Sequence, residues 1–450
     1  MNPLRPANKG PTDQDLAGQF EAIGSSEQTM QSQPSQRLAL FFDGTWNEPG
    51  DHTNVWRLYL MLADRGNDGV PQKPFYDEGV GTHWFDRMSG GAFGGGLSGN
   101  VRKGYRWLME HYNPGDEIFL FGFSRGAFTA RSLAGLIARC GLLKADAPMS
   151  FMQLYERYQR GDESPPIYEF KYFHRKPSDL EEKILLDHTY YNRNLIKMVG
   201  VWDTVGSLGV PFGNIKGVSR HTLRFHNTRL STAVQHSYQA LALNEYRRPY
   251  WPVLWTHFVP KSADPKRTGN DNRTVEQRWF AGAHANVGGG YRSDLLPQRP
   301  LAWIQEKARA CGLGFRSTVS VDEDDLLMSP RDSYSEFLSG CWKALTLGRR
   351  YVRWVNSDPV WKPATNVRGR ETTPGWVQTV NERIDLSVFR RCQLNPLLSD
   401  PSLGEWATRR KLNLKSIVAE PEIYPQYWSP VIGPGIEAAP DAEQISAEVA

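Results

Sequence analysis

The sequence of 450 residues lacks any run of 18 consecutive apolar residues, which excludes an ordinary membrane-spanning helix. Cysteine is scarce, and the four cysteines lie far apart and form no CxxC pair. Zinc-binding and dithiol redox functions therefore have no support, and buried free thiols in a reducing compartment are expected. Neither sign of charge dominates, since 53 basic residues oppose 49 acidic ones. The net charge of +4 gives no reason to expect a nucleic-acid partner.

The N-terminal segment has no apolar stretch after its basic residue, so we expect no secretory signal peptide. We accordingly expect a protein that is cytoplasmic in the producing cell, while delivery by a specialised secretion system stays open. Residues 1–36 are rich in Gln, Ser, Pro and Gly, and residues 433–450 are rich in Pro, Ala and Glu. Because such segments bury little apolar surface, both are predicted to be disordered tails.

Strand-like and helix-like segments alternate between these tails. Short apolar runs predict strands over residues 37–42, 73–76, 117–122, 195–202 and 277–281. Helical spacing of apolar residues predicts helices over residues 54–63, 101–112 and 127–139. The alternation predicts an α/β fold of the hydrolase type, with a mostly parallel sheet covered by helices on both faces, over residues 37–299. Residues 143–194 are predicted to be a lid-like insertion, and residues 300–432 a helical cap region or a second small domain.

A G-x-S-x-G motif, Gly122-Phe123-Ser124-Arg125-Gly126, lies between a predicted strand and a predicted helix. In that context the serine occupies a tight turn, and a side chain at Gly122 or Gly126 would crowd the neighbouring strand or helix. The hydroxyl then projects at the carboxyl edge of the sheet, beside a helix N-terminus, as a nucleophile requires. The alternative interpretation is a glycine-flanked turn whose serine has no chemical role.

A serine nucleophile needs a base, and a carboxylate usually orients that base. His284 follows the apolar residues 279–281 and precedes a glycine-rich stretch, which predicts a loop at a strand end. Asp203 follows the strand predicted over 195–202, so its carboxylate is expected in the same crevice. The chain order Ser124, Asp203, His284 is the order used by α/β-hydrolases. The alternatives are a histidine that caps a turn and an aspartate that caps residues 204–206.

Asp43 ends the first predicted strand and is the second candidate for the triad acid. We favour an oxyanion loop at this turn, with the backbone N–H of Gly44 or Thr45 directed at the site and Asp43 holding the loop through side-chain hydrogen bonds. The backbone N–H of Arg125 is the second expected oxyanion donor. This chemistry requires no metal and no cofactor.

Several blocks of residues resemble the α/β-hydrolase family of type VI secretion lipase effectors, which are phospholipase-like hydrolases. The resemblance covers about residues 37–255 and 278–291. The matching blocks are Phe42–Asn47, Gly99–Val101, Tyr112–Asp116, Phe121–Ala127, Val201–Gly206, Ala242–Arg247 and Trp279–Gly289. The resemblance implies ester hydrolysis of a lipid by a Ser–Asp–His triad, and it names a membrane surface, a secretion-system component and an immunity protein as partners to consider.

Two positions depart from the family pattern. Asn286 stands where the family often has an aspartate, which weakens any supporting role of that side chain. Asp385 stands where a later family block usually has a histidine, so any role of that histidine is lost. A non-catalytic binding module on a hydrolase fold, and a hydrolase of non-lipid esters or peptides, stay open as alternatives.

Three further stretches of the sequence have compositions that suggest binding functions. The glycine-rich residues 90–99 are predicted to be a flexible loop near the site rather than a phosphate-binding loop, because no lysine has the required spacing. Residues 246–255 and 348–354 mix aromatic and basic side chains. Such stretches fit either core packing, which we favour for residues 246–255, or contact with an anionic lipid surface.

Overall fold

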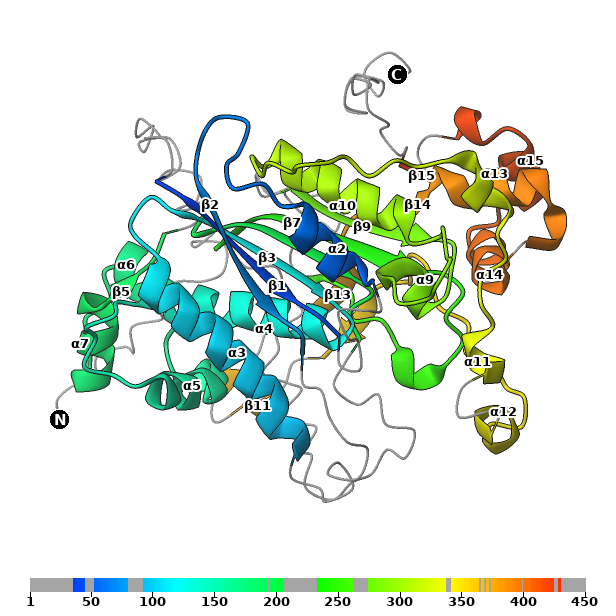
Figure 1. The fold of residues 1–450 in the computed structure, drawn as a ribbon. Helices are drawn as coiled ribbons and strands as arrows, with labels where there is room; N and C mark the ends of the chain where they lie inside the picture. The colour runs from blue at the N-terminus through cyan, green and yellow to red at the C-terminus, as the bar shows by residue number, and fades with distance from the viewer. Residues whose placement is uncertain are drawn as a thin grey trace, which may run out of the picture. The chain divides into compact units, whose positions relative to one another are not determined.

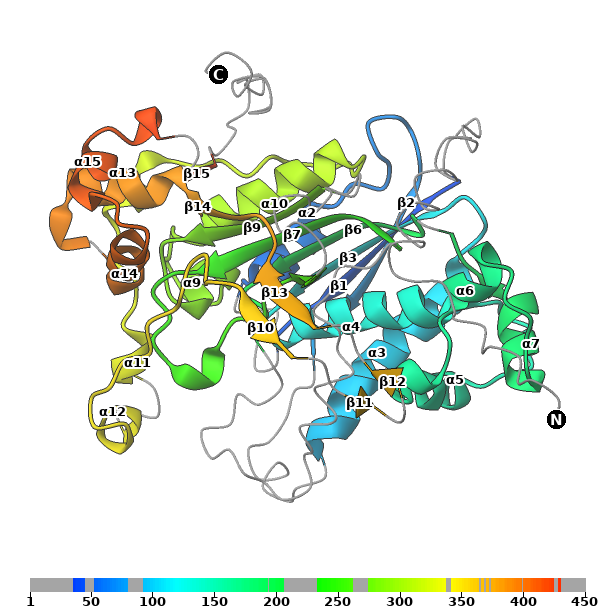
Figure 2. The ribbon, with the colours of Figure 1, turned by 180° about the vertical axis from the view of Figure 1, so that it is seen from behind.

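The computed structural model describes residues 35–429 except 45–51, 80–91, 193, 206–232, 262–273, 337–340, 364–365, 368–369, 372–373, 399 and 425–427. The predicted tails, 1–36 and 433–450, lie outside the described residues apart from Ser35 and Gln36. An eight-stranded sheet has the order β15-β14-β9-β7-β6-β3-β1-β2, and each neighbouring pair is parallel (Figures 1 and 2). The strands are β1 (Arg37–Phe42), β2 (Gln72–Asp77), β3 (Glu117–Phe123), β6 (Ile196–Trp202), β7 (Val234–Ala242), β9 (Thr274–Phe280), β14 (Glu382–Asp385) and β15 (Trp428–Ser429).

Helices cover both faces of the sheet, which confirms the predicted fold class. Alternate residues of β1 belong to different hydrophobic clusters: Leu40 packs with residues of α3 and α4, whereas Phe41 packs with residues of α2 and α10. A parallel strand buried on both sides needs apolar residues at every position, and β1 is buried along its whole length. The covering helices are α2 (Asn54–Met61), α3 (Ala92–His111), α4 (Arg125–Cys140) and α10 (Gln298–Ala310).

The glycine-rich stretch 90–99 differs from its prediction. Helix α3 begins at Ala92, so the part of this stretch that the structure describes is helical and not a loop. A glycine in a helix costs about 1 kcal/mol relative to alanine. The buried Val101, Tyr105 and Leu108 lie further along α3, and their packing against the sheet favours the helix as a whole.

The segment predicted as a lid, residues 143–194, forms three helices beside α3 and α4 (Figure 1). Their buried residues Leu154, Ile167 and Leu185 belong to the same hydrophobic cluster as α3 and α4. Two short antiparallel strands, β4 (Leu142–Leu143) and β5 (Thr189–Tyr190), join the two ends of the segment. The helices are α5 (Phe151–Gln159), α6 (Ile167–Tyr172) and α7 (Leu180–Asp187). A lid motion of this segment stays a prediction.

Residues 300–432, expected to form a cap or a small second domain, contribute β14 and β15 to the central sheet itself. Helices of this region pack against the β9–β14 side of the sheet in a cluster that includes Trp279, Phe389 and Trp406. A separate three-stranded sheet has the order β10-β13-β8. The remaining elements are β8 (Thr256–Pro260), α9 (His284–Gly288), α11 (Ser333–Glu336), α12 (Cys341–Leu345), β10 (Val360–Lys362), β11 (Asn366–Val367), β12 (Arg370–Glu371), β13 (Gly375–Thr379), α13 (Leu386–Leu394), α14 (Pro401–Arg409), α15 (Leu414–Ala419) and five short 3-10 turns.

Candidate active site

Ser124 occupies the turn between β3, which ends at Phe123, and α4, which begins at Arg125. Its backbone has φ of 57° and ψ of −118°, a left-handed conformation that is unfavourable for a residue with a side chain. The Ser124 N–H donates to the carbonyl oxygen of Trp202 at the end of β6, at 3.1 Å. The fold therefore holds this serine in a strained turn at the carboxyl edge of the sheet.

The two glycines of the motif make this turn sterically feasible. A Cβ atom built on Gly122 would lie 2.4 Å from the carbonyl oxygen of Gly126. A Cβ atom built on Gly126 would lie 2.0 Å from the carbonyl oxygen of Phe42 in β1. Both distances are far below van der Waals contact, so only glycine allows α4 to start this close to β3 and β1.

Three side chains from separate parts of the chain form one hydrogen-bonded row. Nε2 of His284 lies 2.8 Å from Oγ of Ser124, and Nδ1 of His284 lies 2.6 Å from Oδ2 of Asp203. Asp203 follows β6 and His284 begins α9, just after β9. Both residues are buried. The structure thus brings together the three residues that the sequence singled out, in the arrangement of a nucleophile, a base and an orienting carboxylate.

Aromatic rings and a glycine fix the His284 ring. The ring centroid of Phe123 lies 4.6 Å from that of His284, and the Tyr250 ring packs edge-on at 5.0 Å. A Cβ atom built on Gly288 would meet the Phe123 ring at 1.9 Å, so α9 can approach β3 only because position 288 is glycine. The imidazole therefore has little room to rotate away from Ser124.

Asp203 has a second partner that sequence reasoning missed. Arg353, which is fully buried, donates to Oδ1 of Asp203 at 2.6 Å and to Oδ2 at 3.0 Å. Burial alone would raise the pKa of Asp203, but the charge of Arg353 and the hydrogen bonds from His284 and Arg353 outweigh it and lower the pKa to about 2. The carboxylate therefore stays ionised near neutral pH. No local pattern marks Arg353 in the sequence, where it lies within the aromatic and basic stretch 348–354.

The hydrogen bonds described for Asp43 join it to the start of α2, to β2 and to its own turn. Its Oδ2 accepts hydrogen bonds from Thr53, the N-cap of α2, at 2.5 Å and from the Tyr76 hydroxyl at 3.0 Å. The Gly44 N–H, expected as an oxyanion donor, donates instead to Oδ1 of Asp43 at 2.6 Å. Of the other two expected donors, Thr45 lies outside the described residues, and Arg125 is the first residue of α4.

Asn286 and Asp385, the two departures from the family pattern, both have structural contacts. Oδ1 of Asn286 accepts the Ala283 N–H at 2.9 Å, which closes the turn before His284, and Nδ2 donates to Asp294 at 2.8 Å. Asp385 ends β14, accepts the Ser387 N–H at the start of α13 and pairs with Arg278 at 3.4 Å. Neither side chain is hydrogen-bonded to Ser124, Asp203 or His284 in these contacts.

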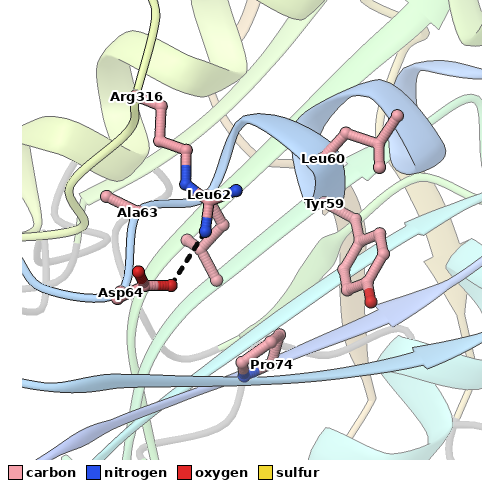
Figure 3. Close-up of a pocket in the computed structure, with 7 residues that line it drawn as sticks. All are labelled: Tyr59, Leu60, Leu62, Ala63, Asp64, Pro74 and Arg316. Carbon is pink, nitrogen blue, oxygen red and sulfur yellow. Dashed lines mark hydrogen bonds and ion pairs between the residues drawn. The ribbon is translucent and has the colours of Figure 1, made fainter.

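Other candidate binding features are sparse in the part of the chain that the structure describes. Within that part, no group of three or more His, Cys, Asp or Glu side chains could hold a metal ion, and no helix is long and apolar enough to cross a membrane. Figure 3 shows a pocket at the end of α2, lined by Tyr59, Leu60, Leu62, Ala63, Asp64, Pro74 and Arg316. Arg316 pairs with Asp64 across it at 2.8 Å. None of the predicted site residues lines this pocket.

The family model for the catalytic domain of Tle1-like phospholipase effectors of the type VI secretion system matches residues 36–307, more than half of the chain. The chain belongs to this family. The resemblance seen in the sequence is thereby confirmed. The matched range contains Ser124, Asp203 and His284 but ends before Arg353.

Individual relatives are more remote. An uncharacterised protein of Saccharomyces cerevisiae, YEL023C, is 25% identical over 316 residues, which are 62% of this chain and 44% of that protein. The chain therefore spans less than half the length of this curated relative. An uncharacterised protein of Pseudomonas aeruginosa has 17% identity and a TM-score of 0.38, with 70% of this chain and 53% of that chain covered. The Tle1 effector bound to the VgrG spike has 14% identity and a TM-score of 0.31, with 88% and 84% covered.

Proposed function

We propose that the chain is a serine hydrolase that cleaves a carboxylic ester of a phospholipid through Ser124, His284 and Asp203. One observation carries the proposal: the continuous hydrogen bonds from Asp203 through His284 to Ser124, at 2.6 and 2.8 Å. The description of the family, phospholipase effectors, supports a phospholipid as the substrate class. The strained turn at Ser124 favours an enzyme over a binding module, because a merely structural serine needs no such conformation.

The reaction proceeds in two balanced steps. Nε2 of His284 accepts the hydroxyl proton of Ser124 while Oγ attacks the ester carbonyl, and the imidazolium then gives that proton to the departing alcohol. Water next attacks the acyl-enzyme while His284 accepts one of its protons, and His284 then gives that proton to Oγ of Ser124 as the fatty acid leaves. Asp203 accepts the Nδ1–H bond throughout, which fixes the tautomer and stabilises the imidazolium.

The oxyanion of each tetrahedral intermediate needs donors close to Ser124. The N-terminus of α4, a helix of 16 residues, begins directly after the nucleophile and places its positive dipole end there. We assign the Arg125 N–H as one donor on this ground. Thr45 remains the proposed second donor in place of Gly44, whose N–H is bound to Asp43.

Two exposed tryptophans, each next in sequence to a residue that contacts the site, support a lipid surface as a partner. Trp251 is 60% exposed and Trp354 is 52% exposed. Trp251 follows Tyr250, whose ring contacts His284, and Trp354 follows Arg353, which binds Asp203. Indole rings are favoured at membrane–water interfaces, so these two side chains are the proposed points of contact with a bilayer.

The family description and the Tle1–VgrG complex support a spike protein of the secretion system as a further partner of this chain. Delivery into another cell, and an immunity protein that blocks the site, extend the same proposal. Hydrolysis of a non-lipid ester or a peptide is the alternative reaction.

Hydrolysis is tested with the Ser124→Ala variant against phospholipid vesicles and short acyl esters. Ser132→Ala is the matched control, because Ser132 lies on the same helix and donates to the Phe128 carbonyl of that helix at 2.7 Å. We expect Ser124→Ala to lower kcat by on the order of 10⁴-fold or more and to abolish labelling by a fluorophosphonate probe. Retained activity or labelling in Ser124→Ala, with both enzymes folded, would contradict the assignment.

Membrane contact is tested by flotation with vesicles that contain anionic phospholipid. The double variant Trp251→Ala/Trp354→Ala should float severalfold less than the parent, while Leu397→Ala, which removes a side chain that is 92% exposed elsewhere, should float like the parent. Equal flotation of the double variant and the parent, or no flotation of the parent, would remove this surface from the proposal.

A further inference from the structure

Arg353 is a buried charge that hydrogen bonds hold to three separate residues. It has no solvent exposure, and its guanidinium makes four hydrogen bonds. Two of these bonds bind the carboxylate of Asp203 in bidentate fashion, at 2.6 and 3.0 Å. The other two bind the carbonyl oxygens of Ala242, at 2.7 Å, and Tyr250, at 2.5 Å. The side chain thus connects Asp203 to the end of β7 and to the segment that carries Tyr250.

The segment that carries Arg353 is itself anchored. The Tyr351 N–H donates to the carbonyl oxygen of Tyr246 at 3.0 Å, and Val355 is buried in the cluster that packs on β9 and β14. This segment follows α12 and lies outside the 36–307 range matched by the catalytic-domain model. The region after residue 307 therefore supplies a charged group to the site.

We propose that Arg353 is a positioning residue of the active site, which fixes the Asp203 carboxylate for His284 and offsets its negative charge. The proposal rests on the proposed function, since it assigns a role within the same row of three residues. Arginine suits this role because its planar fork matches both carboxylate oxygens at once and stays charged when buried.

The orientation of the Asp203 carboxylate depends on the Arg353 guanidinium. Without Arg353, the contacts described for the carboxylate are the Ala242 N–H at 3.0 Å and the His284 ring at 2.6 Å. With so few donors the carboxylate is freer to rotate away from Nδ1 of His284. Its negative charge also loses the cation that offsets it.

The charge of Arg353 also reaches His284 through Asp203. Oδ2 of Asp203 lies 2.6 Å from Nδ1 of His284 and 3.0 Å from the Arg353 guanidinium, so Arg353 offsets the negative charge beside the imidazole. The other charged groups around His284 are already balanced: Glu245 accepts the His284 N–H at 3.3 Å and pairs with Arg247 at 2.7 Å. Among the described residues, Tyr250 is a further titratable neighbour, and its ring packs on His284. Removal of Arg353 would leave the anion Asp203 without its cation.

The first test compares the full-length parent with Arg353→Met and Arg353→Lys, using a soluble ester from pH 4.5 to 9. In Arg353→Met we expect kcat to fall more than tenfold and the acid limb of kcat/KM to move to higher pH by about one unit. Arg353→Lys keeps the charge and should keep the limb near its position in the parent, with a partial loss of kcat. Arg391→Met is the control, because Arg391 is a buried arginine that binds the carbonyls of Asp325 and Met328, at 2.8 and 2.5 Å.

The second test does not depend on turnover. In a Ser124→Ala background, the ring signals of His284 are followed by NMR against pH, with and without Arg353→Met. A titration midpoint that rises on removal of Arg353 supports the proposal even if the parent has no esterase activity. An unchanged midpoint, or an acid limb that moves equally in Arg391→Met, would overturn it. If Arg353→Met does not fold, Arg353→Lys decides the question. Lysine keeps the charge, so an acid limb of kcat/KM that moves about one unit to higher pH in Arg353→Lys would contradict the role of the charge.

Discussion

Replacement of Gly126 by alanine is the most direct test of the turn that presents Ser124. The new Cβ atom would lie 2.0 Å from the Phe42 carbonyl oxygen and 2.6 Å from that of Asp43. Ordinary contact begins at 3.4 Å, so β1 or the start of α4 must move by more than 1 Å. Both obstructing atoms belong to the backbone, so a change of side-chain rotamer gives no relief.

The size of the effect follows from that displacement. Overpacking in a well-packed region typically costs about 1–3 kcal/mol, which outweighs the roughly 1 kcal/mol that alanine gains over glycine within a helix. A shift of about 1 Å in a catalytic group lowers the rate by about 10²-fold. We therefore expect Gly126→Ala to lower the free energy of unfolding by up to about 2 kcal/mol and to lower kcat by about two orders of magnitude.

Denaturant unfolding and ester hydrolysis measure the two effects separately. Gly404→Ala is the matched control, since it also adds a methyl group within a helix, α14, but meets no atom within 4 Å. That variant should be as stable as the parent or slightly more stable, with unchanged kcat. A Gly126→Ala enzyme with the stability and the kcat of the parent would refute the steric reasoning, because it would mean that β1 and α4 do not meet as closely as the structure shows.

Three further predictions concern buried polar groups. Asn286→Asp places a second carboxylate beside Asp294, whose pKa is already raised by burial. The variant should melt at a lower temperature than the parent at pH 7, and the difference between the two melting temperatures should be smaller at pH 5. An equal difference at both pH values would contradict this. The pKa of Asp203 is lowered to about 2, so its charge contributes stability above about pH 4 that is lost as the pH falls towards 2. In denaturant titrations, Asp203→Asn should therefore lose less stability than the parent between pH 5 and pH 3. An equal loss in the two proteins would argue against this contribution. Burial raises the pKa of Cys140 to about 12 and that of Cys311 and Cys392 to about 11. Peptide mass mapping should therefore show that iodoacetamide at pH 8 labels these three cysteines only after unfolding. Labelling of any of them in the folded protein would contradict this.

The sequence predicted β1, β3 and β6 because each is a nearly continuous apolar run, as a strand buried on both faces requires. It did not predict β7, which lies between β6 and β9 in the sheet. Residues 235–239 of β7 include Gln235, His236, Ser237 and Gln239, and this polarity hides the strand. Gln239 is nevertheless fully buried, because its side chain bonds Thr204 and Gln277 from the neighbouring segments. A search for runs of apolar residues misses a strand whose buried side chains are polar and paired by hydrogen bonds.

The site shows the same limit at the level of single residues. Ser124, Asp203 and His284 each follow a recognisable strand, and parallel strands bring such positions to one edge of the sheet. Arg353 follows no strand, and its partners Asp203, Ala242 and Tyr250 lie more than 100 residues earlier in the chain. Its role depends on how an irregular segment crosses the finished fold, which spacing in the sequence does not encode.

The contacts of Asp385 and Asn286, the two departures from the family pattern, explain why both are compatible with the row of three residues. Asp385 pairs with the buried Arg278 and caps α13, so the position that usually carries a histidine serves the junction of β14 and α13 in this chain. Asn286 bonds the Ala283 N–H and thereby shapes the turn that delivers His284, a task that either an amide or a carboxylate oxygen can perform. An amide also avoids a second negative charge beside Asp294. The departures therefore change what surrounds the proposed triad and leave the hydrogen bonds between Asp203, His284 and Ser124 in place.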